Sequence, residues 1–168
     1  MNLGFRAVDE AEDLTRLARW SNDPATKHLY HRFEDAAHLA LEIPPEHFCP
    51  SAEGTTLMVL LDGEPVGHAV LRLGSPKLLE ARETDAWIAL MIGEPQRRGQ
   101  GLGRATLAHL EALAVQQGAT RAEVSVFAYN EGSLSFFQRQ GYVEVTRIDA
   151  RAWFDGRLWD EVRLRKLL

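Results

Sequence analysis

The sequence predicts a mixed α/β fold, a twisted and mainly antiparallel sheet of about seven strands flanked by helices. Seven short β-rich segments are spread along the chain, and two Asp-Gly pairs join neighbouring segments by tight turns. A glycine-rich turn also leads from one strand into a helix and then a further strand. The chain has 168 residues, of which 45% are hydrophobic, so we expect a single domain over residues 1–168.

The first elements are a strand and a helix. Residues 3–8 have the pattern of a short strand, and Asp9 suits the N-cap of a helix with acidic residues in its first turn. An apolar face with helical spacing continues to Trp20, and residues 21–24 end the helix with a proline. Residues 25–50 hold two adjacent prolines and several aromatic side chains, which predicts a short helix and a loop.

The middle of the chain is rich in strands. Residues 55–61 are almost entirely apolar, and the turn pair Asp62-Gly63 links them to a partner strand at residues 66–73. Residues 86–92 form another buried strand. The later elements are a glycine-rich turn at 99–103, a helix to Gln117 closed by Gly118, a strand at 122–128, a helix at 133–140 closed by Gly141, and strands at 143–151 and 158–166 around the turn Asp155-Gly156.

Charge and cysteine content exclude several classes of protein. The net charge of −5 and a pI of about 5.7 argue against a nucleic-acid-binding surface and are compatible with a cationic substrate. Cys49 is the only cysteine, which excludes an intrachain disulfide and a Cys pair for metal. No apolar run approaches the roughly 20 residues that span a bilayer, and residues 1–12 lack an apolar signal core. We expect a cytoplasmic protein with no nucleic-acid or membrane partner.

Residues 96–105, Gln-Arg-Arg-Gly-Gln-Gly-Leu-Gly-Arg-Ala, are predicted to bind a phosphate group. They follow a predicted strand and open a predicted helix, whose first N–H groups are unpaired and lie at the positive end of the helix dipole. Glycines allow the backbone to approach a bulky anion. Arg97, Arg98 and Arg104 add positive charge around the loop.

Three kinds of phosphate loop could use such a turn. A P-loop is absent, because no Lys-Ser or Lys-Thr follows, and the spacing of Gly99, Gly101 and Gly103 is not that of a Rossmann fingerprint. The spacing Arg98-x-x-Gly101-x-Gly103 resembles the pyrophosphate-binding motif of the GNAT superfamily of N-acetyltransferases. A protein that binds ATP or a dinucleotide through the same loop is the disfavoured alternative.

The resemblance spans nearly the whole chain. Asn130, with the short helix and Gly-aromatic pair that follow it, is similar to the family's downstream segment, and residues 20–24 resemble the branch that includes ribosomal-protein alanine acetyltransferases. The likeness is weakest over residues 25–52, where acceptor specificity usually resides. The resemblance implies acetyl-CoA as cosubstrate, and it implies binding contacts from Met91, Ile92, Gly93, Arg97, Arg98, Gly99, Gln100, Gly101, Leu102, Gly103, Arg104, Asn130, Ser133 and Phe137.

The resemblance also implies direct transfer of acetyl to a primary amine of a small molecule or of a peptide N-terminus. Asp85 and then Glu83 are the candidates for general base, near the start of the strand that leads to the loop. Ser125 stands where some family members have a glutamate. Phe137 occupies the position where the family usually has a proton-donating tyrosine, and it cannot donate a proton. Tyr129 is then the candidate acid, and the alternative is that the thiolate leaves unassisted or takes a proton from water.

No metal site is expected. His28 and His31 lie at helical spacing but have no third ligand, so a role at the surface or toward substrate is favoured. A non-catalytic acyl-CoA-binding module and a transferase for longer acyl chains stay open as alternatives. A homodimer also stays open, because the final strands of such domains often pair across a dimer.

Overall fold

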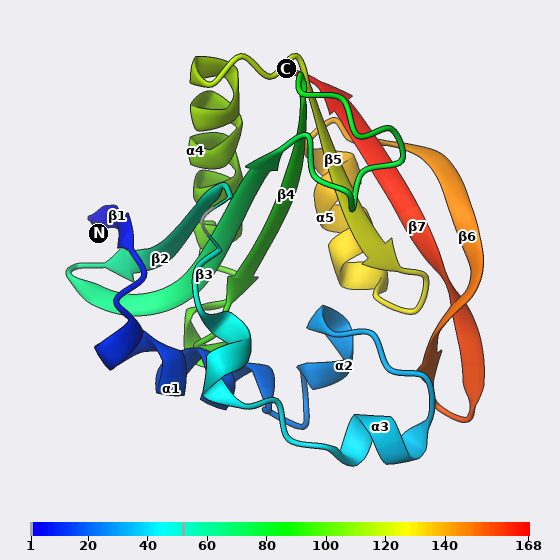
Figure 1. The fold of residues 1–168 in the computed structure, drawn as a ribbon. Coiled ribbons are helices and arrows are strands. Elements are labelled where there is room, and N and C mark those ends of the chain that lie inside the picture. Colours follow the sequence, from blue (N-terminus) through cyan, green and yellow to red (C-terminus); the bar gives the residue numbers. More distant parts are fainter. Residues whose placement is uncertain (1, 52) are drawn as a thin grey trace.

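The computed structural model describes residues 2–51 and 53–168 and contains a seven-stranded sheet in the order β1-β2-β3-β4-β5-β7-β6. All neighbouring strands are antiparallel except β4 and β5, so the expected mainly antiparallel α/β architecture is confirmed. The strands, drawn in Figure 1, are β1 (Leu3–Ala7), β2 (Thr55–Leu61), β3 (Glu64–Leu73), β4 (Asp85–Ile92), β5 (Arg121–Phe127), β6 (Val143–Phe154) and β7 (Arg157–Leu167).

Both predicted Asp-Gly turns join antiparallel strands. Asp62 and Gly63 have φ values of 52° and 90°, and Asp155 and Gly156 have 50° and 79°. Two successive positive φ values are typical of the two-residue turn whose twist matches that of the flanking strands. These local signals therefore fix the pairing of β2 with β3 and of β6 with β7.

Helices α1, α3 and α5 begin at side-chain caps, and α4 begins at a glycine. Asp9 accepts a hydrogen bond from the Ala11 N–H (2.9 Å), as predicted, and Asn130 accepts one from the Ser133 N–H (3.1 Å). Because Asn130 is the cap, the last helix begins at Glu131, two residues earlier than predicted. The helices are α1 (Glu10–Ser21), α2 (Lys27–Tyr30), α3 (Ala36–Ala40), α4 (Leu102–Gln116) and α5 (Glu131–Arg139), with 3-10 helices at Pro45–Phe48 and Pro95–Arg97.

The segment between α1 and β2 holds two short helices and a 3-10 helix where one short helix was predicted. Its backbone is tied to the end of α1 by Asn22. The Asn22 side chain donates to the Ile43 carbonyl (2.8 Å) and accepts from the Ile43 N–H (2.9 Å). This link holds the segment beneath the sheet, near the open end between β4 and β5 (Figure 1).

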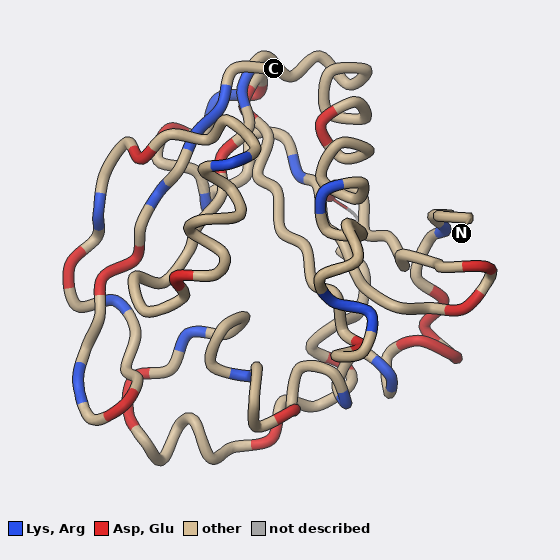
Figure 2. Tube along the Cα trace, turned by 180° about the vertical axis from the view of Figure 1, so that it is seen from behind, with Lys and Arg blue, Asp and Glu red and all other residues tan. Residues whose placement is uncertain are grey.

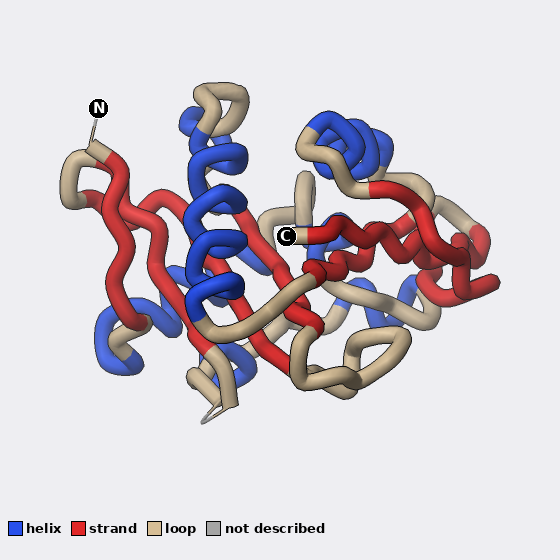
Figure 3. The backbone as a smooth tube through the Cα atoms, turned by 90° about the horizontal axis from the view of Figure 1, so that it is seen from above, coloured by secondary structure: helices blue, strands red, loops and turns tan. Residues whose placement is uncertain are grey.

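Hydrophobic cores cover both faces of the sheet. Ile88 and Ile92 belong to the larger core together with the buried face of α4. Met91, which alternates with them along β4, packs with Leu17 and Trp20 of α1 on the opposite face. Figure 3 shows α4 against the strands from above. No helix in the described part of the chain is long and apolar enough to cross a bilayer.

Strands β4 and β5 form a wedge. They pair only where Asp85–Trp87 faces Arg121–Glu123, and beyond this contact they diverge (Figure 1). The closed end is held by Asp85, whose two carboxylate oxygens accept from Arg121 at 2.8 and 2.6 Å. The β5-facing edge of β4 beyond Trp87 is therefore left without a strand partner.

Candidate functional site

The wedge between β4 and β5 contains a cavity of about 700 Å³. Its walls come from the edges of both strands, the start of α5, the residues around α2, the loop 76–79 and the paired strands β6 and β7. A second cavity of about 260 Å³ adjoins it, and the two share Tyr30, His31, Lys77, Ala89 and Leu90. The cavities meet at Ala89, the one exposed residue of β4.

The glycine-rich loop lies directly after β4, at the open end of the wedge. Gly99 and Gly101 have φ values of 73° and 82°, and a Cβ at either would have no neighbour within 4 Å. Gly101 caps α4, and the N–H groups of Leu102, Gly103 and Arg104 donate to no acceptor in the described part of the chain. Open backbone donors at a helix start are suited to a phosphate group.

Arginines surround this loop, as the blue segment before α4 in Figure 2 shows. Arg98 donates from Nε to the Ile92 carbonyl (2.9 Å) and from Nη2 to the Gly93 carbonyl (3.3 Å), so it anchors the loop to the end of β4. Arg97 and Arg104 are exposed. The free N–H groups at the start of α4, together with Arg97 and Arg104, fit the pyrophosphate of coenzyme A. Arg98 instead holds the loop in shape.

Helix α1 fixes the other side of the strand end. Trp20 packs so closely on Gly93 that a Cβ there would lie 2.1 Å from the indole. The indole Nε1 donates to Glu94 (2.9 Å), and Arg19 pairs with the same carboxylate oxygen (2.7 Å). The Ile92 side chain is buried in the larger core, and the largely buried Met91 side chain also lines the smaller cavity, so this segment meets the larger cavity's side of the wedge mainly through its backbone.

The start of α5 forms the wall on the far side of the wedge. Asn130, Ser133 and Phe137 line the larger cavity, and the structure thus brings them opposite the β4 edge. The Phe137 ring is buried and packs edge-on against Tyr142, with ring centroids 5.4 Å apart. This position offers apolar surface and no proton donor.

The residues predicted to be catalytic lie apart from the cavities. Asp85 is buried in its ion pair with Arg121 at the closed end of the wedge, and Glu83 is exposed in the turn before β4. Tyr129 donates its hydroxyl proton to the His28 carbonyl (2.6 Å), and burial raises the pKa of this phenol above its usual value. None of the three lines either cavity.

Glu161 of β7 is the one carboxylate that lines the larger cavity among the described residues. It accepts a hydrogen bond from the Ser125 hydroxyl and pairs with Arg163 Nε (2.8 Å) and more loosely with Arg151 (3.6 Å). Sequence reasoning missed this residue, because Glu161 stands 36 positions from Ser125 and only the β5–β7 pairing joins them.

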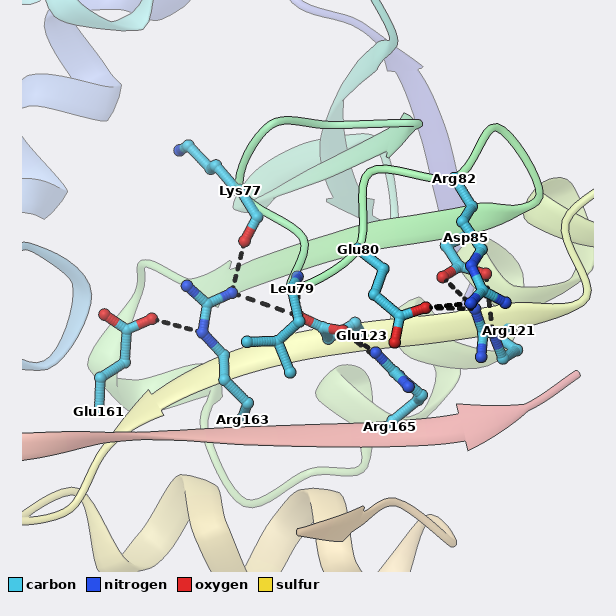
Figure 4. Close-up of polar contacts among 10 residues, drawn as sticks. All are labelled: Lys77, Leu79, Glu80, Arg82, Asp85, Arg121, Glu123, Glu161, Arg163 and Arg165. Carbon is cyan, nitrogen blue, oxygen red and sulfur yellow. Dashed lines mark hydrogen bonds and ion pairs between the residues drawn. The ribbon is translucent and has the colours of Figure 1, made fainter. Parts of the chain in front are cut away.

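Behind Glu161 a buried ionic network continues along β5 and β7 (Figure 4). Arg163 also pairs with Glu123 (3.3 Å) and donates to the Lys77 carbonyl, and Glu123 pairs with Arg165 (2.9 Å) and accepts from the Leu79 N–H (3.0 Å). The network therefore fixes the loop 76–79 against the strands that carry Glu161.

His31 lines both cavities. Its Nε2 is buried and has no hydrogen-bond partner among the described residues. Burial lowers the pKa of its imidazole to about 4, helped by His47 and Lys77 nearby, so the ring is neutral at pH 7. No group of three or more His, Cys, Asp or Glu side chains suited to a metal ion occurs among residues 2–51 and 53–168.

Comparison with known proteins identifies a matching family. The model of the acetyltransferase (GNAT) family matches residues 14–142. No curated protein sequence matches the chain. Among solved structures, a provisionally assigned phosphinothricin N-acetyltransferase has a TM-score of 0.78 at 19% identity, with 99% of each chain covered.

Two further solved structures share the fold. An acetyltransferase from Salmonella typhimurium with acetyl-CoA bound has a TM-score of 0.74 at 16% identity, over 100% of this chain and 95% of that chain. The ribosomal-protein-alanine N-acetyltransferase from Brucella melitensis has a TM-score of 0.75 at 22% identity, over 98% and 99%. At these identities the likeness concerns the fold.

Proposed function

The chain belongs to the acetyltransferase (GNAT) family, and we propose that this acetyl-CoA-dependent N-acetyltransferase acetylates the primary amine of a small molecule or of a peptide N-terminus. The wedge between β4 and β5 carries the proposal. It has a helix start with open N–H donors at its open end and, inside, a cavity of about 700 Å³ lined by a carboxylate. Such a site can hold an acyl donor and an amine in contact.

Coenzyme A fits the residues of one side of the wedge. The free N–H groups of Leu102, Gly103 and Arg104 would hold its pyrophosphate, with Arg97 nearby. Its pantetheine arm would follow the unpaired β4 edge, between that strand and the start of α5. When bound, acetyl-CoA supplies the thioester whose acetyl group is transferred to the amine, giving the N-acetyl product and free CoA.

We assign the general base to Glu161. The acceptor amine arrives as an ammonium, with a pKa of about 8 for an α-amine or about 10 for a lysine, and must lose a proton before it attacks. Ser125 and Arg163 hold the Glu161 carboxylate in one orientation at the cavity wall, where it can accept that proton directly or through one water. The leaving thiol, with a pKa near 8.5, needs no protein acid, which agrees with Phe137 at the cavity wall.

The first test of this function is calorimetric titration with acetyl-CoA, with CoA, ATP and NAD in parallel. We expect micromolar or tighter binding of acetyl-CoA and no binding of ATP or NAD. A panel of primary amines is then assayed for release of free thiol. Absence of acetyl-CoA binding, or preference for ATP or NAD, would contradict the assignment of the loop.

A further inference from the structure

We infer that the acetyl acceptor carries an anionic group beside its amine, and that Arg72 and Lys77 bind this group in the smaller cavity. The acceptor class is thus a small amino acid or a similar aminophosphonate or aminophosphinate. The inference rests on the proposed function and narrows its substrate. It starts from the charges of the cavity: Arg72 and Lys77 line it, and no Asp or Glu of the described residues does.

Neither cation has a counter-ion among residues 2–51 and 53–168. The Lys77 backbone carbonyl accepts from Arg163, whereas its ammonium points away from the ionic network (Figure 4) and pairs with no described side chain. The Arg72 guanidinium likewise forms no ion pair in the described part of the chain, and its buried Nε has no hydrogen-bond acceptor. Arg163, by contrast, is already paired with Glu161 and Glu123.

Two neighbouring cations without an anion repel each other in a partly buried site. The pKa of Lys77 is lowered by burial and then by the positive charges of Arg72 and Arg163, with only Glu161 acting in the opposite direction. A bound anion would relieve this repulsion and would satisfy the Arg72 donor. The two neighbouring positive charges therefore favour the binding of a negatively charged group in this cavity.

Other polar atoms of the cavity are also free. Thr56, His31 and His68 line it, and the buried Nε2 atoms of both histidines have no hydrogen-bond partner among the described residues. Side chains that can form hydrogen bonds around two cations are typical of sites for carboxylate and phosphorus oxyanions. A polyamine would find no carboxylate in this cavity and would meet repulsion instead.

The position of the cavity suits the reaction. It joins the larger cavity at Ala89 and Leu90, on the free edge of β4, and Lys77 lines both. An acceptor whose anion contacts Arg72 and Lys77 would extend its amine into the larger cavity, which Glu161 lines. In an α-amino acid the amine and the carboxylate are attached to the same carbon, so an anion held at Lys77, which lines both cavities, would place the amine near their junction.

The test compares matched amines that differ only in the anionic group. The pairs are L-leucine with isoamylamine and 2-aminoethylphosphonate with ethanolamine, and spermidine is the polycationic control. We expect kcat/KM for the anionic member of at least one pair to exceed that of its neutral partner by 100-fold or more.

Arg72→Gln and Lys77→Met should each raise KM for that amine at least 10-fold, with the Kd for acetyl-CoA unchanged. Arg82→Gln, an exposed change outside both cavities, is the control and should behave as wild type.

A second readout separates this inference from the proposed function. Binding of the same amines to the CoA complex is measured by calorimetry, without turnover. Binding of anionic amines that is lost in Arg72→Gln and Lys77→Met would support the inference even if no amine were acetylated. Turnover or binding that favours the neutral amines or spermidine, or that is unchanged in both variants, would overturn it while leaving the N-acetyltransferase activity standing.

Discussion

Gly101 combines a left-handed backbone conformation with open space at the start of α4. Its φ of 82° places it in the left-handed region, and the space around it is open. We predict that Gly101→Val raises the Kd for acetyl-CoA at least 10-fold, because the side chain would occupy the phosphate cradle. Calorimetry measures this. Gly118→Val is the matched control, since Gly118 also has a positive φ (94°) and open surroundings but lies at the far end of α4. Both variants should lose about 1–2 kcal/mol of stability, and equal losses of acetyl-CoA affinity would contradict the prediction.

Glu161 is the residue on which the proposed chemistry depends. We predict that Glu161→Gln lowers kcat by about 10²- to 10³-fold with little change in the Kd for acetyl-CoA, because the amide keeps the shape of the side chain and cannot accept the proton. Steady-state kinetics with a turned-over amine measures it. Glu83→Gln, in the exposed turn before β4, is the control and should keep full activity. An active Glu161→Gln enzyme would remove this glutamate from the mechanism.

At the scale of elements, the divergence of β4 and β5 creates the site, and the Asp85–Arg121 pair holds its closed end. Both Asp85 oxygens are engaged by Arg121, and the carboxylate is buried. We predict that Asp85→Asn lowers the free energy of unfolding by about 2–4 kcal/mol, because the guanidinium of Arg121 loses its bidentate partner and keeps only the longer contact with Glu80 (3.8 Å). Denaturant unfolding measures this loss. A variant of unchanged stability but greatly reduced kcat would instead support the catalytic role predicted from sequence.

At the scale of the whole molecule, two partly buried histidines couple stability to pH. Burial lowers the pKa of His68 to about 4, against an ordinary value of 6.5, although Asp13 acts weakly in the other direction. The unfolded chain therefore binds more protons between pH 6.5 and 4, and the free energy of unfolding falls as the pH falls through this window. We predict a loss of about 3 kcal/mol from His68 between pH 6.5 and 4, at about 1.4 kcal/mol per pKa unit.

His68→Leu tests this origin. Its free energy of unfolding should fall less than that of wild type between pH 7 and pH 4.5, as measured by urea unfolding at both pH values. His31 shares the lowered pKa and should account for part of the remaining slope. Parallel pH dependence in wild type and variant would show that His68 does not titrate as argued.

The molecule has a negative net charge, whereas the charged side chains that line its smaller cavity are positive. The chain carries −5 overall, and acidic residues gather on α1 and the turn between β2 and β3 (Figure 2). The smaller cavity is lined by Arg72 and Lys77. A cationic substrate was compatible with the net charge, but binding follows the local field of the site, in which nearby charges dominate.

The sequence by itself determined what depends on neighbours in the chain. The Asp-Gly turns, the cap at Asp9 and the glycine-rich helix start are local backbone signals, so the order of the strands and longer helices and the place of the glycine-rich loop before α4 could be predicted within a few residues. The short helices between α1 and β2 could not, because contacts such as Asn22 with Ile43 hold them in place.

Only the tertiary structure decided which charged side chains meet. Asp85 precedes the loop in sequence, yet pairing of β4 with β5 turns it toward Arg121. Pairing of β5 with β7 brings Glu161 to Ser125, and the ionic network turns the Lys77 ammonium out into the cavities. A carboxylate or an ammonium looks the same in a sequence whether it is paired, solvated or aimed at a substrate. Its role is set by long-range strand register and burial, which bring together groups that no local pattern connects.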